Sequence, residues 1–263
     1  MNKSFLRRET HSTTTNMNEV FKLSKANDKL AKLSRRVGRK VRSMSLKAGY
    51  SCPGARDCLA KFDSAKREKI IGPETGFVCF AASLESIFGG FDSNNWHNFK
   101  LVTQSKSEAQ LLELILRSLA TVSEGEIFRV HIAGDFLNAK YFRAWMRAAA
   151  MRPGVHFYAY TKSLHYWIEN KALVPANFNL TASKGGKFDH LIKPNGLKYS
   201  EVVFSEGQAE GLRLEIDHDD WHAAFGRNSF ALLIHGAQKA GSKAAAAVAE
   251  LNRIKRQGQS QAA

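Results

Sequence analysis

Apolar residues recur along the middle of the chain in two alternating patterns, one typical of helices and one typical of buried strands. The helical pattern is clearest at residues 108–121, where Ser107 can cap the helix and leucine and isoleucine form a wide apolar face. A second helix is predicted after Asn138, with Tyr141 and Trp145 on its apolar side. A third, shorter helix is predicted near residues 164–170.

Predicted strands separate these helices, and the one at residues 127–133 has the apolar density and abrupt end of a buried parallel strand. They lie at residues 40–47, 127–133, 155–160, 178–181, 201–204 and 230–234, and one more extended stretch is predicted at residues 99–102. The alternation predicts an α/β fold with a parallel sheet and helices outside it, most economically a full or partial (β/α) barrel. An open doubly wound sheet is the alternative.

Polar, charged or imidazole side chains follow the predicted strands where each strand ends. They are Asp135, Thr161, Lys162, Ser183, Lys184, Ser205, Glu206 and His235. Because the carboxyl ends of parallel strands meet at one edge of a sheet, these residues are expected to surround one pocket. The other interpretation is that strand ends lie near the surface, where polar residues are common without any function.

The chain has three cysteines, Cys52, Cys58 and Cys79, all within one short region rich in polar and turn-forming residues. Three thiolates can hold an iron–sulfur cluster and leave one iron open for a ligand, whereas a closed four-ligand site is usually structural. Zinc, a redox pair or simple packing are the alternatives. A structural disulfide is disfavoured because the count is odd and no signal peptide is visible.

The net charge of +15 is concentrated at the two ends of the sequence. Residues 1–50 carry 13 Lys/Arg and 3 acidic residues, whereas residues 51–238 carry 21 and 20. We therefore divide the chain into a basic N-terminal arm at 1–43, which is either helical or disordered, an α/β domain with the cysteines at 44–250 and a flexible tail at 251–263. The arm could bind nucleic-acid phosphates or be a solvated tail. The predicted contacts are Arg35, Arg36, Arg39, Lys40 and Arg42.

Length and composition indicate a folded protein rather than a disordered one. The 263 residues are 44% hydrophobic and 10% aromatic, enough for a sizeable core. No apolar run approaches the ~20 residues that a membrane helix requires. We expect a soluble, cytoplasmic protein with no membrane partner.

Acidic and histidine residues are dense at 217–222. Asp217, His218, Asp219 and His222 could bind a divalent metal or support acid–base chemistry. Alternatively, the aspartates cap a helix that begins near Trp221.

Several motifs resemble a family of bacteriophage proteins named after a mycobacteriophage gene product 88, which has no assigned activity. The similar stretches lie at residues 48–58, 79–82, 131–136, 157–163, 180–183, 203–206, 217–220 and 233–236. The resemblance spans roughly residues 44–250 and implies a phage protein of the host cytoplasm.

The arrangement also resembles, more weakly, that of radical S-adenosylmethionine enzymes. In that family three cysteines after the first barrel strand hold a four-iron cluster, and a glycine-rich strand end binds the amino group of the cofactor. Cys79-Phe80 and Gly134-Asp135 fall in corresponding places. The spacing differs, because the family motif is compact and the last gap here is 20 residues.

We therefore expect a phage-encoded iron–sulfur protein with a cluster of the 4Fe–4S type, resembling a radical S-adenosylmethionine enzyme and acting on or near nucleic acid. The expected catalytic residues are Asp135, Lys162, Glu206 and His235, and the expected cofactor-binding residues are Gly134, Asp135, Ser183 and Lys184. The alternatives are a non-enzymatic nucleic-acid-binding protein with a structural metal, and a metal-dependent nuclease or hydrolase. Neither the small-molecule substrate nor the reaction follows from these residues.

Overall fold

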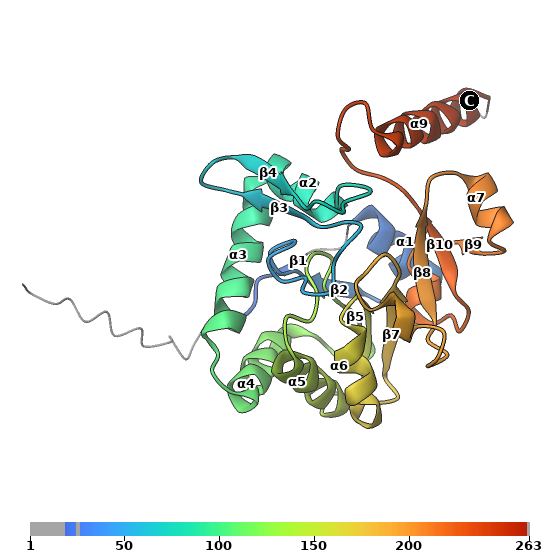
Figure 1. The fold of residues 1–263 in the computed structure, drawn as a ribbon. Helices are drawn as coiled ribbons and strands as arrows, with labels where there is room; N and C mark the ends of the chain where they lie inside the picture. The colour runs from blue at the N-terminus through green and yellow to red at the C-terminus, as the bar shows by residue number, and fades with distance from the viewer. Residues whose placement is uncertain (1–18, 25–26, 262–263) are drawn as a thin grey trace, which may run out of the picture.

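The computed structural model describes residues 19–24 and 27–261, and its centre is a sheet of eight strands in the order β1-β2-β5-β6-β7-β8-β10-β9 (Figure 1). The strands are β1 (Leu23–Ser24), β2 (Val41–Met44), β5 (Ile127–Val130), β6 (His156–Thr161), β7 (Phe178–Ser183), β8 (Tyr199–Val203), β9 (Glu215–Ile216) and β10 (Phe230–Leu233). β1 pairs with β2 in antiparallel fashion, and the remaining neighbours are parallel. The predicted mainly parallel α/β sheet is confirmed.

The strand order shows how the sheet is wound. From β2 through β5, β6, β7 and β8 to β10, each strand is added at the same edge; β3 and β4 form a separate hairpin, and β9 lies outside β10. A doubly wound sheet would reverse direction at a switch point. Among the described residues β1 and β9 each have one neighbour, so the sheet is open and a closed barrel is not confirmed.

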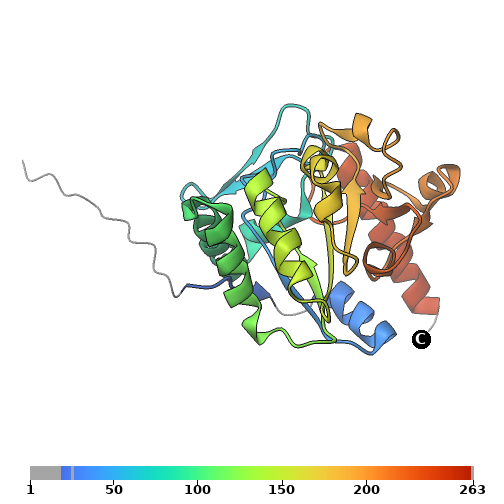
Figure 2. The same cartoon turned by 90° about the horizontal axis from the view of Figure 1, so that it is seen from below.

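One face of the sheet is covered by α4 (Glu108–Ser118), α5 (Ala139–Ala150), α6 (Leu164–Glu169) and α7 (Glu206–Gly211). Figure 2 shows α4 and α5 side by side on this face. Their largest core contribution is Trp145, which is fully buried between Phe128 and Phe157. The Ser107 hydroxyl accepts a hydrogen bond from the Gln110 amide, which confirms the predicted helix start.

The opposite face carries α1 (Asp28–Val37) and α8 (Trp221–Ala224). Leu30 and Leu33 of α1 are fully buried there against Tyr158 and Phe230. Residues 27–43, which we assigned to a basic arm, thus contribute a helix and most of strand β2 to the folded body. Residues 1–18 and 25–26 of that arm lie outside the described residues.

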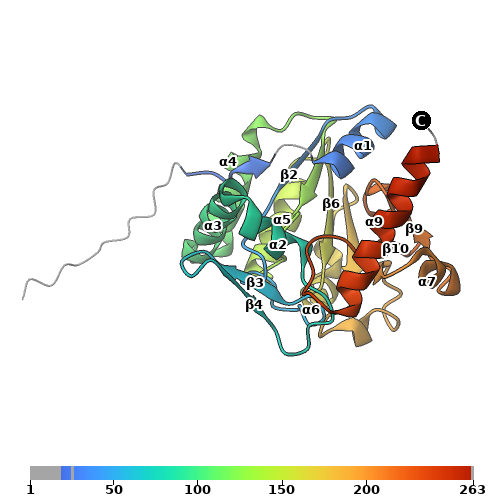
Figure 3. The same ribbon diagram turned by 90° about the horizontal axis from the view of Figure 1, so that it is seen from above.

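The remaining elements surround the sheet. They are the hairpin β3 (Ala60–Asp63) and β4 (Glu68–Ile71), α2 (Phe80–Ile87), α3 (Gly89–Gln104), the short 3-10 helices Leu119–Thr121, Lys171–Leu173 and Asp189–Leu191, and α9 (Lys243–Gln261). The prediction of an extended stretch at residues 99–102 was wrong, because these residues end α3. The segment predicted as a flexible tail continues α9 to residue 261. Figure 3 shows this helix crossing in front of β9 and β10, and Figure 1 shows it beyond the ends of these strands. Within the described ranges, no helix is both long and apolar enough to cross a bilayer.

Candidate metal centre

The cysteine loop, residues 45–59, leaves the carboxyl end of β2 and crosses the ends of the next strands. Its backbone is bound to the segment after β7, where the Lys187 amide donates to the Gly54 carbonyl oxygen at 2.9 Å. A Cβ atom at Gly54 would lie 2.4 Å from the Lys162 carbonyl oxygen at the end of β6. Only glycine allows this approach, so the loop carrying the first two cysteines is fixed across the strand ends.

The carboxyl end of β5 contacts the same loop. Gly134 follows this strand with φ of +89°, and a Cβ atom there would lie 2.5 Å from Ser51 Oγ. Both the backbone conformation and the close contact require glycine. The predicted convergence of strand ends around one place is therefore present for β5, β6 and β7.

Cys79 reaches this place from a separate part of the chain. The Gly76 amide donates to the Asp57 carbonyl oxygen at 2.8 Å, which ties the segment before Cys79 to the residue before Cys58. The Cys58 and Cys79 thiol groups are hydrogen bonded to each other. Cys52 lies close enough to interact electrostatically with both. The three cysteines thus lie in the same region of the molecule.

The surroundings make the three thiols differ in acidity. The hydrogen bond with Cys79 lowers the pKa of Cys58 to about 6, burial opposes this shift and the Lys162 ammonium supports it. The same hydrogen bond, with burial, raises the pKa of Cys79, and burial raises the pKa of Cys52 to about 12. These surroundings favour the thiolate form at Cys58 over that at Cys52 and Cys79.

Lys162 is a buried cation beside these thiols, 8% exposed. Its ammonium group donates to the carbonyl oxygen of Ser183 at 2.9 Å, the hydroxyl of Ser183 at 3.0 Å and the carbonyl oxygen of Lys184 at 2.7 Å. Within the described ranges these acceptors are uncharged, and no carboxylate forms an ion pair with it. A buried cation bound only to neutral acceptors stabilises negative charge nearby, and its charge acts to lower the pKa of both Cys58 and the Asp135 carboxyl.

Asp135 holds two strand ends together. Its carboxylate accepts hydrogen bonds from the Thr161 hydroxyl at 2.7 Å, the Lys162 amide at 2.8 Å and the Phe136 amide at 2.7 Å. Burial raises the pKa of this carboxyl despite these bonds. Three donors within the chain already occupy the side chain that we expected to accept a hydrogen bond from a ligand amine.

Three other predicted residues point elsewhere. Lys184 forms an ion pair with Glu201 at 2.7 Å. Glu206 is exposed at the start of α7, and none of the described side chains binds it. The His235 ring lies 4.9 Å from the ring of Phe80, the residue after Cys79, so this histidine borders the cysteine site from the far side of an aromatic ring.

The basic residues predicted to contact nucleic acid are mostly engaged within the chain. Arg36 pairs with Asp219, Arg39 donates to the carbonyl oxygen of Gly125, and Lys40 and Arg42 pair with Glu126. Arg35 is exposed and lines a cavity. Any phosphate would have to compete with these internal partners at four of the five positions.

The segment at residues 217–222 is held by internal bonds. The Asp217 carboxylate accepts hydrogen bonds from the amides of Asp220 and His222 at 2.5 and 2.8 Å. The Asp220 carboxylate is fully buried and pairs with Arg129 at 2.6 Å and Lys29 at 2.7 Å. These two carboxylates therefore hold the turn and balance buried cations, which favours the structural interpretation of this segment.

A metal centre needs several donor side chains that converge on one ion or cluster. In the present arrangement the described residues include no group of three His, Cys, Asp or Glu side chains that could hold a metal ion. A single zinc ion would require each thiolate at about 2.3 Å, whereas a cluster attaches each thiolate to a different iron. Three thiols in one region beside a buried cation are the kind of donor set that an anionic, thiolate-bound group would use.

Sequence reasoning missed a second buried lysine next to the loop. Lys47 is completely buried, pairs with Glu85 at 2.9 Å and also contacts Asp92. It lies just after β2, in a stretch whose apolar neighbours gave no sign of a charge pair. This group anchors the start of the cysteine loop to α2 and α3.

Comparison with known proteins agrees with the motifs. The family model described as "Gene product 88" matches residues 21–254. The chain is 29% identical over 185 residues to the gene 88 protein of Mycobacterium phage L5, covering 62% of this chain and 66% of that protein. It is 24% identical over 173 residues to the gene 88 protein of Mycobacterium phage D29, covering 62% and 65%.

The chain thus spans slightly less than two thirds of the length of these two relatives, which supports the predicted bacteriophage origin. No solved structure matches it. The family match includes α1 and β2, in agreement with their place in the folded body. On the extent of this match, the chain belongs to the gene product 88 family.

Proposed function

We propose that Cys52, Cys58 and Cys79 bind an iron–sulfur cluster of the 4Fe–4S type. The observation that carries the proposal is the meeting of all three cysteines of the chain, from two separate segments, beside Lys162 at the carboxyl edge of a parallel sheet. Three ligands leave one iron open to a substrate or to S-adenosylmethionine.

Each neighbouring residue has a defined part in this proposal. Lys162 balances the negative charge of a thiolate-bound cluster. Asp135 fixes the ends of β5 and β6 against each other, which positions the cysteine loop. Gly54 and Gly134 let the loop backbone lie flat on the strand ends. When bound, the cluster would supply electron transfer or Lewis-acid chemistry at its open iron.

A radical S-adenosylmethionine enzyme is the finer form of this proposal. In its favour, the cysteine loop follows the first parallel strand, and the following strands are added in one direction as in a partial barrel. The wide spacing between Cys58 and Cys79 is accommodated by the hairpin β3–β4, inserted between them. The substrate would lie at the carboxyl ends of the strands.

The test is metal analysis of protein purified without oxygen. We expect brown protein with iron and sulfide each near about four per chain, and loss of both in Cys52→Ser, Cys58→Ser and Cys79→Ser variants that keep their circular dichroism. Lys162→Met is expected to lower the iron content. Its control is Lys184→Met, which removes the lysine that follows the neighbouring strand β7. Colourless protein after anaerobic reconstitution with iron and sulfide, or cysteine variants with full iron content, would refute the proposal.

A further inference from the structure

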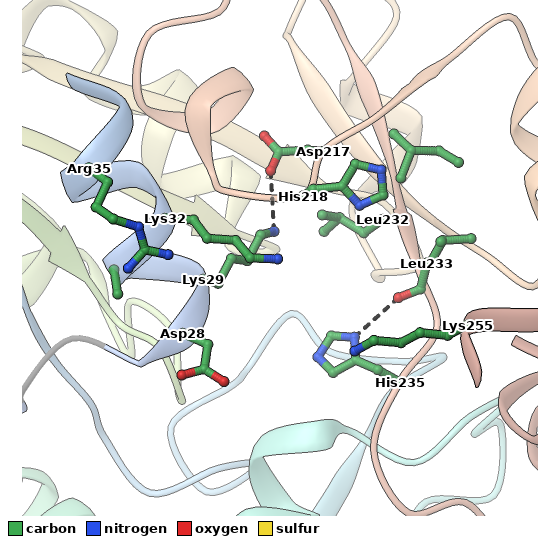
Figure 4. A pocket seen from close by; sticks show the side chains of 12 residues that line it. Asp28, Lys29, Lys32, Arg35, Asp217, His218, Leu232, Leu233, His235 and Lys255 are labelled. Atoms are coloured by element: carbon green, nitrogen blue, oxygen red, sulfur yellow. Dashed lines mark hydrogen bonds and ion pairs between the residues drawn. The ribbon is translucent and has the colours of Figure 1, made fainter. Parts of the chain in front are cut away.

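A second site lies at the carboxyl ends of the last two strands of the sheet. Here a cavity of about 570 Å³ opens between α1, the ends of β9 and β10, and α9 (Figure 4). Its volume falls in the range of small-molecule sites, roughly 300–1,000 Å³. None of the three cysteines lines it.

The charges around this cavity are predominantly positive. Lys29, Lys32 and Arg35 face it from α1, and Lys255 faces it from α9 on the other side (Figure 4). Lys29 is already neutralised by Asp217 at 3.3 Å and Asp220. In the part of the chain that the structure describes, the other three cations have no ion pair or hydrogen bond. Asp28 is the one remaining acid in the lining, so the cavity carries uncompensated positive charge.

The rest of the lining suits a ligand with a flat, apolar body. Ile216, Leu232 and Leu233 form an apolar wall, and the imidazoles of His218 and His235 stand beside it. Apolar side chains with a few convergent polar groups are typical of ligand sites. An imidazole ring beside an apolar wall can stack on an aromatic base.

The cations are of the kind that recognise phosphate. The guanidinium of Arg35 can bind a phosphate through two parallel hydrogen bonds, and the ammonium groups of Lys32 and Lys255 add point charges. These groups come from two opposite walls, so an anionic ligand in the cavity would have cations on both sides. A carboxylate alone would leave the apolar wall and much of the volume unused.

From this combination we propose that the cavity binds a nucleoside phosphate, with the base against Leu232 and the imidazoles and the phosphate between α1 and α9. The nucleotide could be free or part of an oligonucleotide, since both present the same groups. His235 stands between this cavity and Phe80, so the ligand would lie next to the cysteine centre. Only the position of the ligand next to the cysteine centre rests on the proposed function; nucleotide binding in the cavity does not.

The test is titration calorimetry of the full chain with four probes: adenosine triphosphate, adenosine monophosphate, inorganic pyrophosphate and a short single-stranded oligonucleotide. The double variant Arg35→Ala/Lys255→Ala removes two cavity charges. Its control, Lys69→Ala/Lys100→Ala, removes two exposed charges outside the cavity lining. We expect the cavity variant to weaken nucleotide binding by about ten-fold or more and the control to leave it unchanged.

The outcomes separate the alternatives. Binding of mononucleotides that falls only in the cavity variant supports a free nucleotide, and the same pattern with the oligonucleotide alone supports a nucleotide within a polymer. No binding of any probe at millimolar concentration, or equal losses in the two double variants, would overturn the inference. Repeating the titration on Cys58→Ser protein separates this site from the cluster, because nucleotide binding should persist there.

Discussion

Replacement of Asp220 by asparagine should destabilise the protein strongly although the two side chains have nearly the same shape. The Asp220 carboxylate is fully buried and accepts hydrogen bonds from Arg129 at 2.6 Å, Tyr158 at 3.0 Å and Tyr160 at 2.9 Å, besides its ion pair with Lys29. Removing its charge leaves Arg129 buried without a counter-ion, and breaking such pairs costs about 3–5 kcal/mol. For a chain of this size that corresponds to a fall in Tm of roughly 6–20 °C.

The assay is urea unfolding followed by circular dichroism, with Asp219→Asn as the control. Asp219 pairs with the half-exposed Arg36, so its replacement should cost less than about 1 kcal/mol. The surrounding cations hold the pKa of Asp220 well below its usual range. Its stabilising contribution is therefore complete above the unfolded-state pKa and falls as the pH drops below it. If Asp220→Asn cost as little as the control, or stabilised the chain as expected of crowded metal-binding carboxylates, the structural role assigned here would be wrong.

Three further predictions follow from single residues. Burial lowers the pKa of His131 from 6.5 to about 3, so between these pH values the unfolded chain binds a proton that the folded chain does not. The free energy of unfolding should therefore fall as the pH drops from 6.5 to 3. This pH dependence should be weaker in His131→Asn, because asparagine tolerates the positive φ but does not titrate. Gly134→Ala should lower the free energy of unfolding by at least about 2 kcal/mol and also lower the iron content. Its control, Gly207→Ala, lies in open space on α7 and should not destabilise the chain. Equal effects of the two variants on the urea midpoint would contradict the close contact between Gly134 and Ser51. Deleting residues 1–42 removes α1 with Leu30 and should unfold the chain by circular dichroism, so a truncated protein with an intact spectrum would place those residues outside the core.

Local patterns predicted the strands and helices of the sheet well. The apolar run at residues 127–133 and the capped helix starting after Ser107 have the predicted type and place. The prediction of an extended stretch at residues 99–102 was wrong because the half of α3 before them is polar and does not show an apolar helical pattern. Its buried amides explain the pattern: Asn98 donates to the carbonyl oxygens of Lys22 and Ser45, so polarity there marks buried hydrogen bonds rather than a loop.

The candidate site was predictable in part for a similar reason. Strand ends and clustered cysteines are local signals, and Cys52, Cys58, Asp135 and Lys162 did converge. Partners far apart in sequence leave no such signal. Arg129 and Asp220 are 91 residues apart, and the local sequence around either residue does not predict the other as its partner. The same holds for the cavity, whose walls come from α1 and α9 at opposite ends of the chain.

The outermost strands of the sheet have a consequence for solubility. An open sheet normally exposes two rows of unpaired amide and carbonyl groups, which can template pairing with another molecule. Here the terminal strands β1 and β9 are each only two residues long. Such short edge strands offer little length for a second chain to add to, so the sheet can remain open at both edges without becoming a seed for aggregation.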